Sequence, residues 1–271
     1  MSPHVHRIIC DAERKIYETK PTDEACPAGP TAKANNIPSQ KFVRDKQVDA
    51  HHVRIIRAHN GGALRTMNGG LAHENGWYPS RKARRILHWE GLAQHDYVQC
   101  LEVDFSVARM ATESVRFEFV RGGKMQVYTV DVELLGVDGS MTLVEIKRDE
   151  DDLRDADYRA KLGYVREICE KQGIRFKVVY RHDIWKSLIH RRNVSLFCSR
   201  RFVTIRPEHV ARLEAHGQKM GADATFGSLA EALEPRCART GEAVLQALTV
   251  ARRVEIDLTR HLLDATPITI H

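Results

Sequence analysis

The sequence lacks the features that would place the protein in a membrane, outside the cell or around a structural zinc ion. None of its apolar runs approaches the roughly 20 residues that a transmembrane helix needs. The first ten residues, MSPHVHRIIC, lack the basic region and apolar core of a secretory signal. The six cysteines lie far apart and form no C-x-x-C pair, which argues against a zinc ribbon and for reduced thiols. We therefore expect a cytoplasmic protein with no membrane partner.

Two further absences narrow the chemistry. The sequence holds no G-x-x-x-x-G-K-[ST] loop, so an ATPase function has no support. Its 14 histidines form no H-x-x-x-H or His–Cys grouping, so we expect structural or surface roles for them. The net charge is less informative about function: 42 Lys and Arg against 36 Asp and Glu give a formal charge of +6. That mild excess fits a nucleic-acid partner and an ordinary basic enzyme equally well.

Length and local composition divide the 271-residue chain into three parts. Residues 1–60 are poorly defined, because residues 20–40 are rich in Pro, Ala and small polar residues without periodicity and indicate a flexible segment. Residues 75–202 alternate between helical and strand patterns and predict one domain. Residues 203–271 hold three short helical patterns and one short strand, VEIDL, and predict a second, smaller domain.

The larger domain is predicted to be an α/β fold, a mixed sheet flanked by helices. A glycine-rich loop is expected to lead into a helix from Lys82 to about Glu102, where apolar residues recur at three- and four-residue spacing. β-branched and aromatic residues then predict strands, and an Asp-Gly turn predicts a hairpin. The expected strands are 114–120, 125–135, 142–147 and 175–181, and the remaining helices are 157–173 and 184–201.

Two basic clusters are candidates for contacts with a DNA backbone. Lys82, Arg84 and Arg85 precede the expected first helix. Arg252 and Arg253 stand at the start of a presumed wing, since three helices followed by a strand are the outline of a winged helix. Small helical packing domains share that outline, and solvated basic residues explain both clusters without DNA. Both alternatives stay open.

Two acidic residues interrupt strands that otherwise consist of apolar residues. Asp131 lies in YTVDVEL and Glu145 lies in LVEIK. A carboxylate in a central strand is costly unless it is paired, hydrogen-bonded or bound to a cation. Two carboxylates on neighbouring strands repel each other, and Mg²⁺ would turn that repulsion into binding, because it takes one or two carboxylates together with waters and phosphate oxygens.

The register of the hairpin decides whether these two acids can meet. A two-residue turn pairs Asp131 with Ile146, which puts the two acids on opposite faces of the sheet. A three-residue loop or one bulge pairs Asp131 with Lys147, and both acids and the lysine then share one face. The functional hypothesis therefore predicts an odd loop or a bulge. The plain alternative is a cross-strand ion pair between Asp131 and Lys147, with Glu145 facing solvent.

With the acids on one face, their roles follow from charge. Asp131 and Glu145, with the backbone carbonyl of Ile146, would hold one or two Mg²⁺ ions, for which Mn²⁺ is the expected substitute. Such a metal lowers the pKa of a bound water and neutralises charge on a phosphoryl group. Lys147 would orient that water or stabilise the transition state.

The order of these residues resembles the PD-(D/E)XK nuclease superfamily, in which D, E-x-K and a helix acid form the site. More narrowly, the chain resembles the TnsA-type endonucleases of heteromeric transposons over about residues 75–200, with a similar tail, LLDATPITI. The segments that carry the resemblance are YPSRKARRILHWE (78–90), HDYVQCLEVDFSV (95–107), YTVDV (128–132), VEIK (144–147) and RRNVSLF (191–197).

The resemblance implies a restriction-endonuclease-like fold and a metal-dependent endonuclease that nicks double-stranded DNA at transposon ends. It also implies a DDE-type transposase and an AAA+ regulator as partners. The family's usual helix Glu falls at Gln94, so Glu90, one helical turn earlier, is the expected replacement. The predicted metal ligands are then Glu90, Asp131 and Glu145, and with Lys147 they form the predicted catalytic set.

The sequence departs from the family pattern at three places. Besides Gln94, the strand motif reads Val-Asp-Val where Pro-Asp-Phe is usual, and Glu113-Ser114 stands where Gln-Pro is frequent. Two alternative functions stay open. One is a stand-alone restriction or anti-phage defence nuclease on the same core. The other is a DNA- or protein-binding adaptor in which the fold survives without catalysis, and Gln94 favours that adaptor.

Overall fold

The computed structural model describes residues 40–41, 53–59, 62–65 and 74–271, which belong to one compact unit from Ile37 to His271. The flexible segment expected at residues 20–40 falls almost entirely outside the described residues. The helices are α2 (Leu92–Val103), α3 (Ala156–Lys171), α4 (Arg181–Ile184), α5 (Leu188–Arg200), α6 (Pro207–Met220), α7 (Phe226–Leu233) and α8 (Ala238–Val250). The strands are β1 (Gln40–Lys41), β2 (Arg54–Arg57), β3 (Asn75–Ser80), β4 (Arg85–Glu90), β5 (Val107–Thr112), β6 (Val115–Arg121), β7 (Lys124–Thr129), β8 (Val132–Gly136), β9 (Met141–Lys147), β10 (Arg175–Tyr180), β11 (Val254–Ile256) and β12 (Ile268–Ile270).

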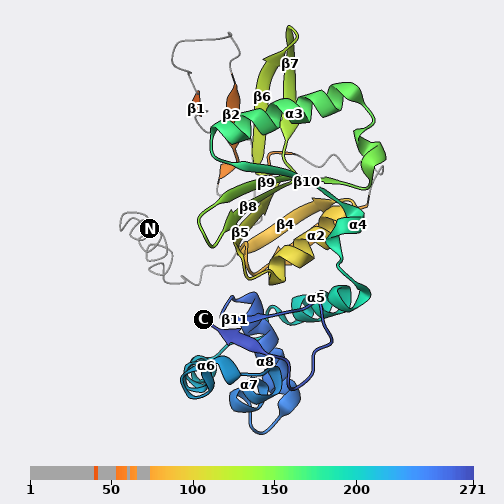
Figure 1. The fold of residues 1–271 in the computed structure, drawn as a ribbon. Helices are drawn as coiled ribbons and strands as arrows, with labels where there is room; N and C mark the ends of the chain where they lie inside the picture. The colour runs from red at the N-terminus through yellow and green to blue at the C-terminus, as the bar shows by residue number, and fades with distance from the viewer. Residues whose placement is uncertain (1–39, 42–52, 60–61, 66–73) are drawn as a thin grey trace, which may run out of the picture. The chain divides into compact units, whose positions relative to one another are not determined.

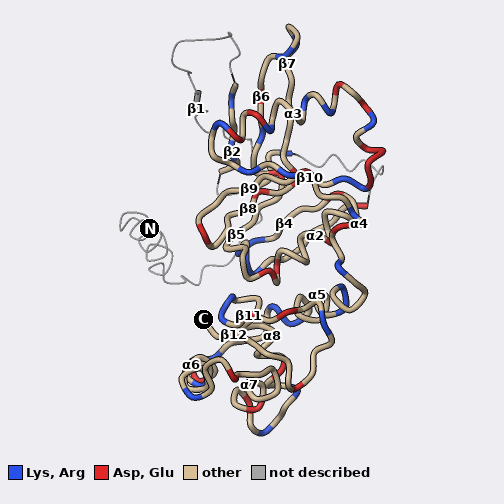
Figure 2. The backbone as a smooth tube through the Cα atoms, viewed as in Figure 1, with Lys and Arg blue, Asp and Glu red and all other residues tan. Residues whose placement is uncertain are grey.

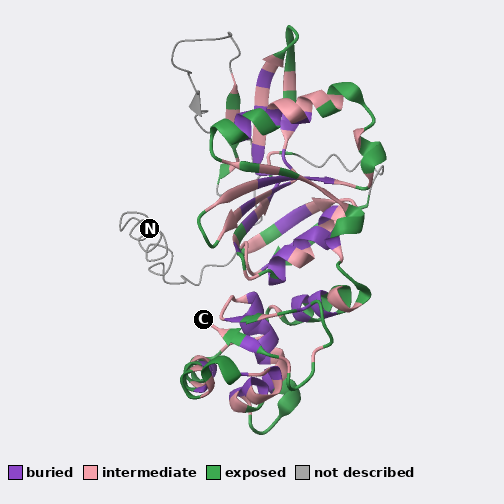
Figure 3. Cartoon of the chain, in the orientation of Figure 1, coloured by how far each residue is buried: buried purple, intermediate pink, exposed green. Residues whose placement is uncertain are grey.

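A four-stranded mixed sheet in the order β10-β9-β8-β5 lies at the centre of the larger part (Figure 1). β10 runs parallel to β9, and the other pairs are antiparallel. Side chains alternate along β9, so Val144 and Ile146 pack with α2 while Leu143 packs with α3. Buried residues accordingly fill the central strands and the facing sides of the helices (Figure 3). The predicted α/β fold with a mixed sheet between helices is confirmed, and its restriction-endonuclease-like identity stays a prediction.

A second sheet, in the order β1-β2-β6-β7, explains why the single strand expected at 125–135 is wrong. The chain leaves this sheet after β7 and enters the central sheet at β8. Val130 packs in the cluster beside α3, whereas Val132 packs in the cluster beside α2. Residues two apart in a regular strand share one face, so the backbone turns over at Asp131. The residues on both sides of Asp131 are mostly apolar, so the sequence gives no sign that the strand ends there.

The first half of the helix expected from Lys82 to Glu102 is also wrong. β3 and β4 form an antiparallel hairpin instead, and the helix begins only at Leu92. Within β4, Ile86 is exposed and Leu87 is buried, and the whole strand pairs with β3 from Arg85 to Glu90. Gly91, with a φ of 83°, separates the hairpin from α2. The apolar residues of β4 and of α2 together have the spacing of one long helix, which is why the sequence predicted one.

The acidic run after β9 is a largely exposed turn. It contains a short 3-10 helix, η2 (Glu150–Leu153), visible as a red segment before α3 (Figure 2). Asp155 then caps α3 by accepting hydrogen bonds from the amides of Asp157 and Tyr158. Gly173, with a φ of 68°, follows the end of α3 as the sequence indicates.

The C-terminal residues form three helices followed by a two-stranded antiparallel sheet, β11-β12. The three expected helices are present, and β12 was not expected. The helix predicted at 184–201 begins only at Leu188, as α5, because Ser187 accepts a hydrogen bond from the amide of His190 and caps the helix there. Val194 and Phe197 of α5 lie in the same buried cluster as α7 and α8. The boundary at 202/203 and the winged-helix identity stay predictions.

Two further observations concern membrane-spanning helices and cysteines. Among the described residues, no helix combines the length and the apolar composition that crossing a bilayer requires. The four described cysteines, Cys100, Cys169, Cys198 and Cys237, are free thiols.

Candidate functional site

The β8–β9 hairpin has the odd loop that the functional hypothesis requires. Leu135 pairs with Met141, and the amide of Gly136 donates to the carbonyl of Ser140 at 2.8 Å. Three residues, 137–139, therefore form the loop. Val132, the first residue of β8, pairs with Val144, so the expected pairing of Asp131 with Lys147 is wrong. Asp131 stands at the bend just before β8, where alternation no longer fixes its face, and its closeness to Glu145 and Lys147 follows from contacts and not from the register.

Asp131 stands where the chain enters β8, and its neighbours crowd it with negative charge. Its Oδ2 accepts a hydrogen bond from the amide of Ile146 at 2.7 Å. Burial and the nearby charge of Glu145 raise the pKa of Asp131, and they outweigh the opposing effects of that hydrogen bond and of Lys147. A carboxyl group whose pKa is raised by burial beside another carboxylate is the electrostatic condition that a bound cation relieves.

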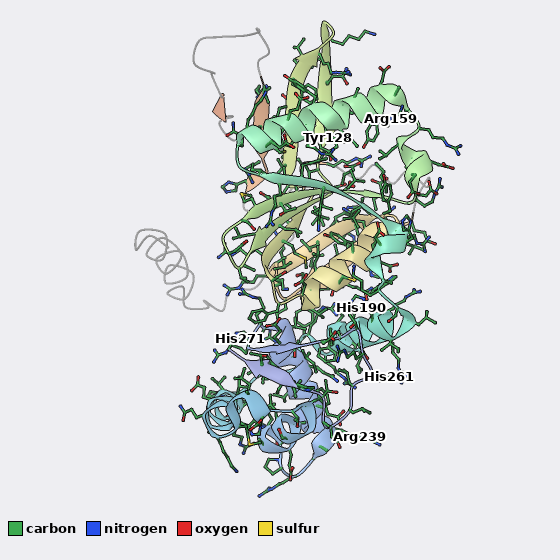
Figure 4. The ribbon with its side chains drawn as sticks, in the orientation of Figure 1. Tyr128, Arg159, His190, Arg239, His261 and His271 are labelled. Carbon is green, nitrogen blue, oxygen red and sulfur yellow. The ribbon has the colours of Figure 1, made fainter. Side chains whose placement is uncertain are left out.

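Glu145 is only 2% exposed, and both its oxygens have partners. Oε1 accepts a hydrogen bond from the hydroxyl of Tyr158 and lies 2.5 Å from Nζ of Lys147. Oε2 accepts from the hydroxyl of Tyr128, the residue labelled beside α3 in Figure 4. The alternative in which Glu145 faces solvent is therefore wrong, and the ion pair of Lys147 is with Glu145 and not with Asp131.

Lys147 is the positively charged member of this group, and its neighbours fix its side chain. Its side chain is 17% exposed, and Nζ lies 4.8 Å from the centre of the Tyr158 ring. Burial alone would lower the pKa of Lys147, but the charge of Glu145 and its hydrogen bond outweigh burial, so the pKa is raised. Lys147 is therefore an ammonium at neutral pH, and it occupies one oxygen of a candidate metal ligand.

The donor set suits a hard divalent cation, although the side chains are not yet arranged around one. Carboxylate oxygens of Asp131 and Glu145 are the ligands that Mg²⁺ and Mn²⁺ prefer. No group of three or more His, Cys, Asp or Glu side chains in the described part of the chain stands ready to hold a metal ion. A cation at Glu145 would replace Lys147 at Oε1, which would free the ammonium for another anion.

Glu90 does not lie on a helix, so its expected approach along the helix is wrong. It is the last residue of β4, and its Oε2 pairs with Nη1 of Arg65 at 2.9 Å. Gln94 lies on α2 and links the two parts of the site: Oε1 accepts from the amide of Glu90 at 2.6 Å, and Nε2 donates to the carbonyl of Asp131 at 3.1 Å. Metal binding by Glu90 stays a prediction.

The first basic cluster belongs to the β3–β4 turn and not to a helix start. Nζ of Lys82 donates to the carbonyls of Leu101, at 2.6 Å, and Asp104, which caps the C-terminus of α2. Burial lowers the pKa of Lys82 to about 8. Arg84 is exposed in the turn with a φ of 55°, and Arg85 begins β4. DNA contacts by these residues stay predictions, and Lys82 already has a structural role.

The second basic cluster also has partners within the protein. Nε of Arg252 donates to the carbonyl of Phe105 at 3.2 Å, and its guanidinium lies 5.4 Å from the centre of that ring. Arg253 pairs with Glu214 at 3.3 Å. Arg252 thus joins the C-terminal helices to the segment before β5. DNA binding by the two arginines stays a prediction.

Sequence analysis missed four residues of this region: Tyr128, Tyr158, Glu113 and His88. The two tyrosines resemble ordinary core aromatics, and nothing local distinguishes the one on β7 or the one on α3. Glu113 carried a weak signal, since it is an acid between two apolar strands. His88 carried none, because its partners come from distant segments.

No protein-family model matches the sequence, and no curated protein matches it either. The similarity to TnsA-type endonucleases therefore remains a resemblance carried by the quoted sequence segments and the ordered residues Asp131, Glu145 and Lys147.

Proposed function

We propose that the protein is a metal-dependent DNA endonuclease that hydrolyses a phosphodiester bond, with Mg²⁺ or Mn²⁺ held by Asp131 and Glu145. One observation carries the proposal. Asp131, at the bend before β8, accepts a hydrogen bond from the amide of Ile146, the residue between Glu145 and Lys147 at the end of β9. A plain structural ion pair explains Lys147 and Glu145 but does not explain a second carboxyl group beside them.

Each residue has a distinct task in this reaction. The bound cation would lower the pKa of an attacking water and offset charge on the phosphate. Asp131 and Glu145 supply oxygen ligands. Lys147, once released from Glu145, is a fixed positive charge beside the reacting phosphate and stabilises the charge that develops on its oxygens. Tyr128 and Tyr158 orient Glu145 through their hydroxyl groups.

The finer proposal is a subunit of a heteromeric transposase that nicks double-stranded DNA at transposon ends in the cytoplasm. A DDE-type transposase and an AAA+ regulator are its proposed partners. Support comes from the ordered sequence segments at residues 78–90, 95–107, 128–132, 144–147 and 191–197, together with a mixed sheet between two helices. The three C-terminal helices and the β11–β12 hairpin fit the proposed winged helix, which would contact DNA or a partner subunit.

The test begins with metal binding by calorimetry. The native chain should bind Mg²⁺ and Mn²⁺, and Asp131→Ala and Glu145→Ala should each abolish the binding. Glu150→Gln is the matched control, because Glu150 is an exposed acid in the neighbouring turn and should leave binding unchanged. Nicking of supercoiled plasmid, alone and with candidate partner subunits, follows. Absence of metal binding by the native chain, with and without duplex DNA, would contradict the proposal.

An adaptor without catalysis is the second candidate, and two observations favour it. Gln94 brings an amide where the related nucleases bring an acid, and both oxygens of Glu145 are already engaged by Tyr128, Tyr158 and Lys147. A protein that binds duplex DNA equally well with and without divalent metal, and that never nicks it, would be this adaptor.

A further inference from the structure

A second cluster of ionisable side chains lies beside Asp131, and apart from Glu90, which the sequence analysis assigned to the first site, the proposed nuclease chemistry does not account for it. Its centre is Glu113, between β5 and β6. Glu113 is 2% exposed and has a φ of 52°, a left-handed conformation that few glutamates adopt. Its amide donates to the carbonyl of Asp131 at 3.0 Å, which ties this cluster to the candidate site. A strained backbone and a buried acid at one residue call for a physical explanation.

Two buried atoms of the cluster have no hydrogen-bond partner. They are Oε2 of Glu113 and Nδ1 of His88. The side chains of these residues are only 3% and 4% exposed, so bulk water does not reach them. The two atoms face each other at 3.8 Å, which is too long for a hydrogen bond. Native proteins seldom leave such atoms unpaired, and an ion between them is one of the recognised reasons.

The separation of the two atoms fits a metal ion better than a water molecule. A cation about 2.1 Å from each atom would make an angle of about 130° with them, and closing the gap by about 0.4 Å gives a tetrahedral angle. A bridging water with hydrogen bonds of about 2.8 Å would be forced to an angle of about 85°.

The charge balance of the cluster also leaves room for a cation. Nη1 of Arg65 lies 2.9 Å from Oε2 of Glu90 and 3.7 Å from Oε1 of Glu113. One guanidinium thus serves two carboxylates. Arg65 is 56% exposed and Glu90 is 27% exposed, so this side of the cluster is open to solvent. A cation could enter there by displacing Arg65.

We propose that His88 and Glu113, joined by Glu90 when Arg65 moves away, form a second divalent-cation site that binds Mn²⁺ or Zn²⁺ in preference to Mg²⁺. Without metal, Arg65 takes the place of the cation and the three side chains are not gathered around one point. Selectivity follows from the imidazole nitrogen, because Mg²⁺ is bound mainly by oxygen ligands and water, whereas imidazole is a good ligand for transition metals. The bound ion would stiffen the backbone at Glu113 and, through its amide, the position of Asp131. This site does not depend on the endonuclease proposal.

The test is a titration of the full chain with Mn²⁺ by calorimetry in an excess of Mg²⁺, which occupies a site built only of carboxylates. The native chain should still bind one Mn²⁺. His88→Asn and Glu113→Gln should each weaken this binding by at least about tenfold. Asp131→Ala should retain it. Arg65→Ala should bind Mn²⁺ as tightly or more tightly, because a competing cation is gone.

Three results would overturn the inference: no Mn²⁺ binding in the presence of Mg²⁺, unchanged binding in His88→Asn and Glu113→Gln, or loss of binding in Asp131→Ala. Because Glu113 is buried, circular dichroism is used to check that its variant is folded. Pulsed electron paramagnetic resonance on the native chain then decides without any variant. A nitrogen coupling to the bound Mn²⁺ is expected from His88, and its absence refutes the site. Mn²⁺ bound at this second site without plasmid nicking would contradict only the nuclease proposal.

Discussion

In the metal-free protein, Glu145 and Lys147 should depend on each other for stability, and a double-mutant cycle measures how much. Glu145 is 2% exposed and its partner Lys147 is 17% exposed. Removing one member of a buried ion pair costs about 3–5 kcal/mol, because the other charge stays buried without a partner. Lys147 reaches some solvent, so we expect Glu145→Gln to cost about 3 kcal/mol, at the lower end of that range.

The reverse change should cost less. In Lys147→Met, Glu145 keeps the hydroxyl groups of Tyr128 and Tyr158, so about 2 kcal/mol is expected, the scale of one hydrogen bond to a charged group. The double variant should cost about 3 kcal/mol rather than the sum of the single costs, which leaves a coupling of about 2 kcal/mol. Urea unfolding at pH 7 with a chelator measures the free energies. The Glu145→Gln loss corresponds to a fall in melting temperature of about 6–12 °C.

Additive single costs, within about 0.5 kcal/mol, would show that the two side chains do not share a buried contact and would refute the reasoning. Metal provides the second half of the experiment. A ligand that binds only the folded state raises its stability by an amount that grows with concentration. Mg²⁺ or Mn²⁺ should therefore stabilise the native chain and Lys147→Met, but should stabilise Glu145→Gln much less.

Three further predictions address the loop, the helix cap and the titration of the site. Gly139 has a φ of 79° in the hairpin loop, so Gly139→Ala should lower the free energy of unfolding by about 1 kcal/mol. Gly163 lies on α3, where an added Cβ meets nothing within 4 Å, so Gly163→Ala should raise the free energy of unfolding by up to about 1 kcal/mol. Urea unfolding in which both variants shift the stability in the same direction would contradict this. The pKa of Lys82 is lowered to about 8 from 10.5, so between these values the unfolded chain binds more protons and stability should rise with pH. Lys82→Met should lose that rise, and an unchanged pH profile would contradict the cap. The pKa of Asp131 is raised, so the folded state holds a proton that the unfolded state has lost, and this contribution to stability should disappear as pH rises through the folded pKa. Binding of a metal ion should release the same proton from Asp131, so the affinity for the metal should increase with pH. Calorimetry in buffers of different ionisation enthalpy should detect the released proton. A metal affinity that does not change with pH would contradict this prediction.

Local sequence patterns were enough for elements whose neighbours in the chain are also their neighbours in space. The hairpin around residues 137–139, the helix that ends before Gly173 and the three C-terminal helices all follow from period and turn chemistry. The shared face of Glu145 and Lys147 belongs here too, because residues two apart in one strand point to the same side. The position of Asp131 does not, because the chain turns over at that residue.

Patterns failed where two elements meet without a visible boundary. The strand β4 and the helix α2 are joined by Gly91 alone, so their apolar residues combined into one false helix, and Glu90 was placed on it. The strands β7 and β8 are joined at Asp131, and the apolar residues on both sides hide a turn of the backbone. The spacing of apolar residues along the sequence cannot show which of two sheets a strand joins.

The sequence by itself determined an α/β chain with a central hairpin and the order Asp131, Glu145, Lys147. Tertiary structure alone decided what these residues touch. Tyr158 reaches Glu145 from α3, and His88 meets Glu113 across 25 positions of the chain. Such contacts depend on how the strands of different sheets and the helices over them pack together. This packing minimises the exposure of apolar side chains over the whole fold, so it cannot be predicted from any single segment of the sequence.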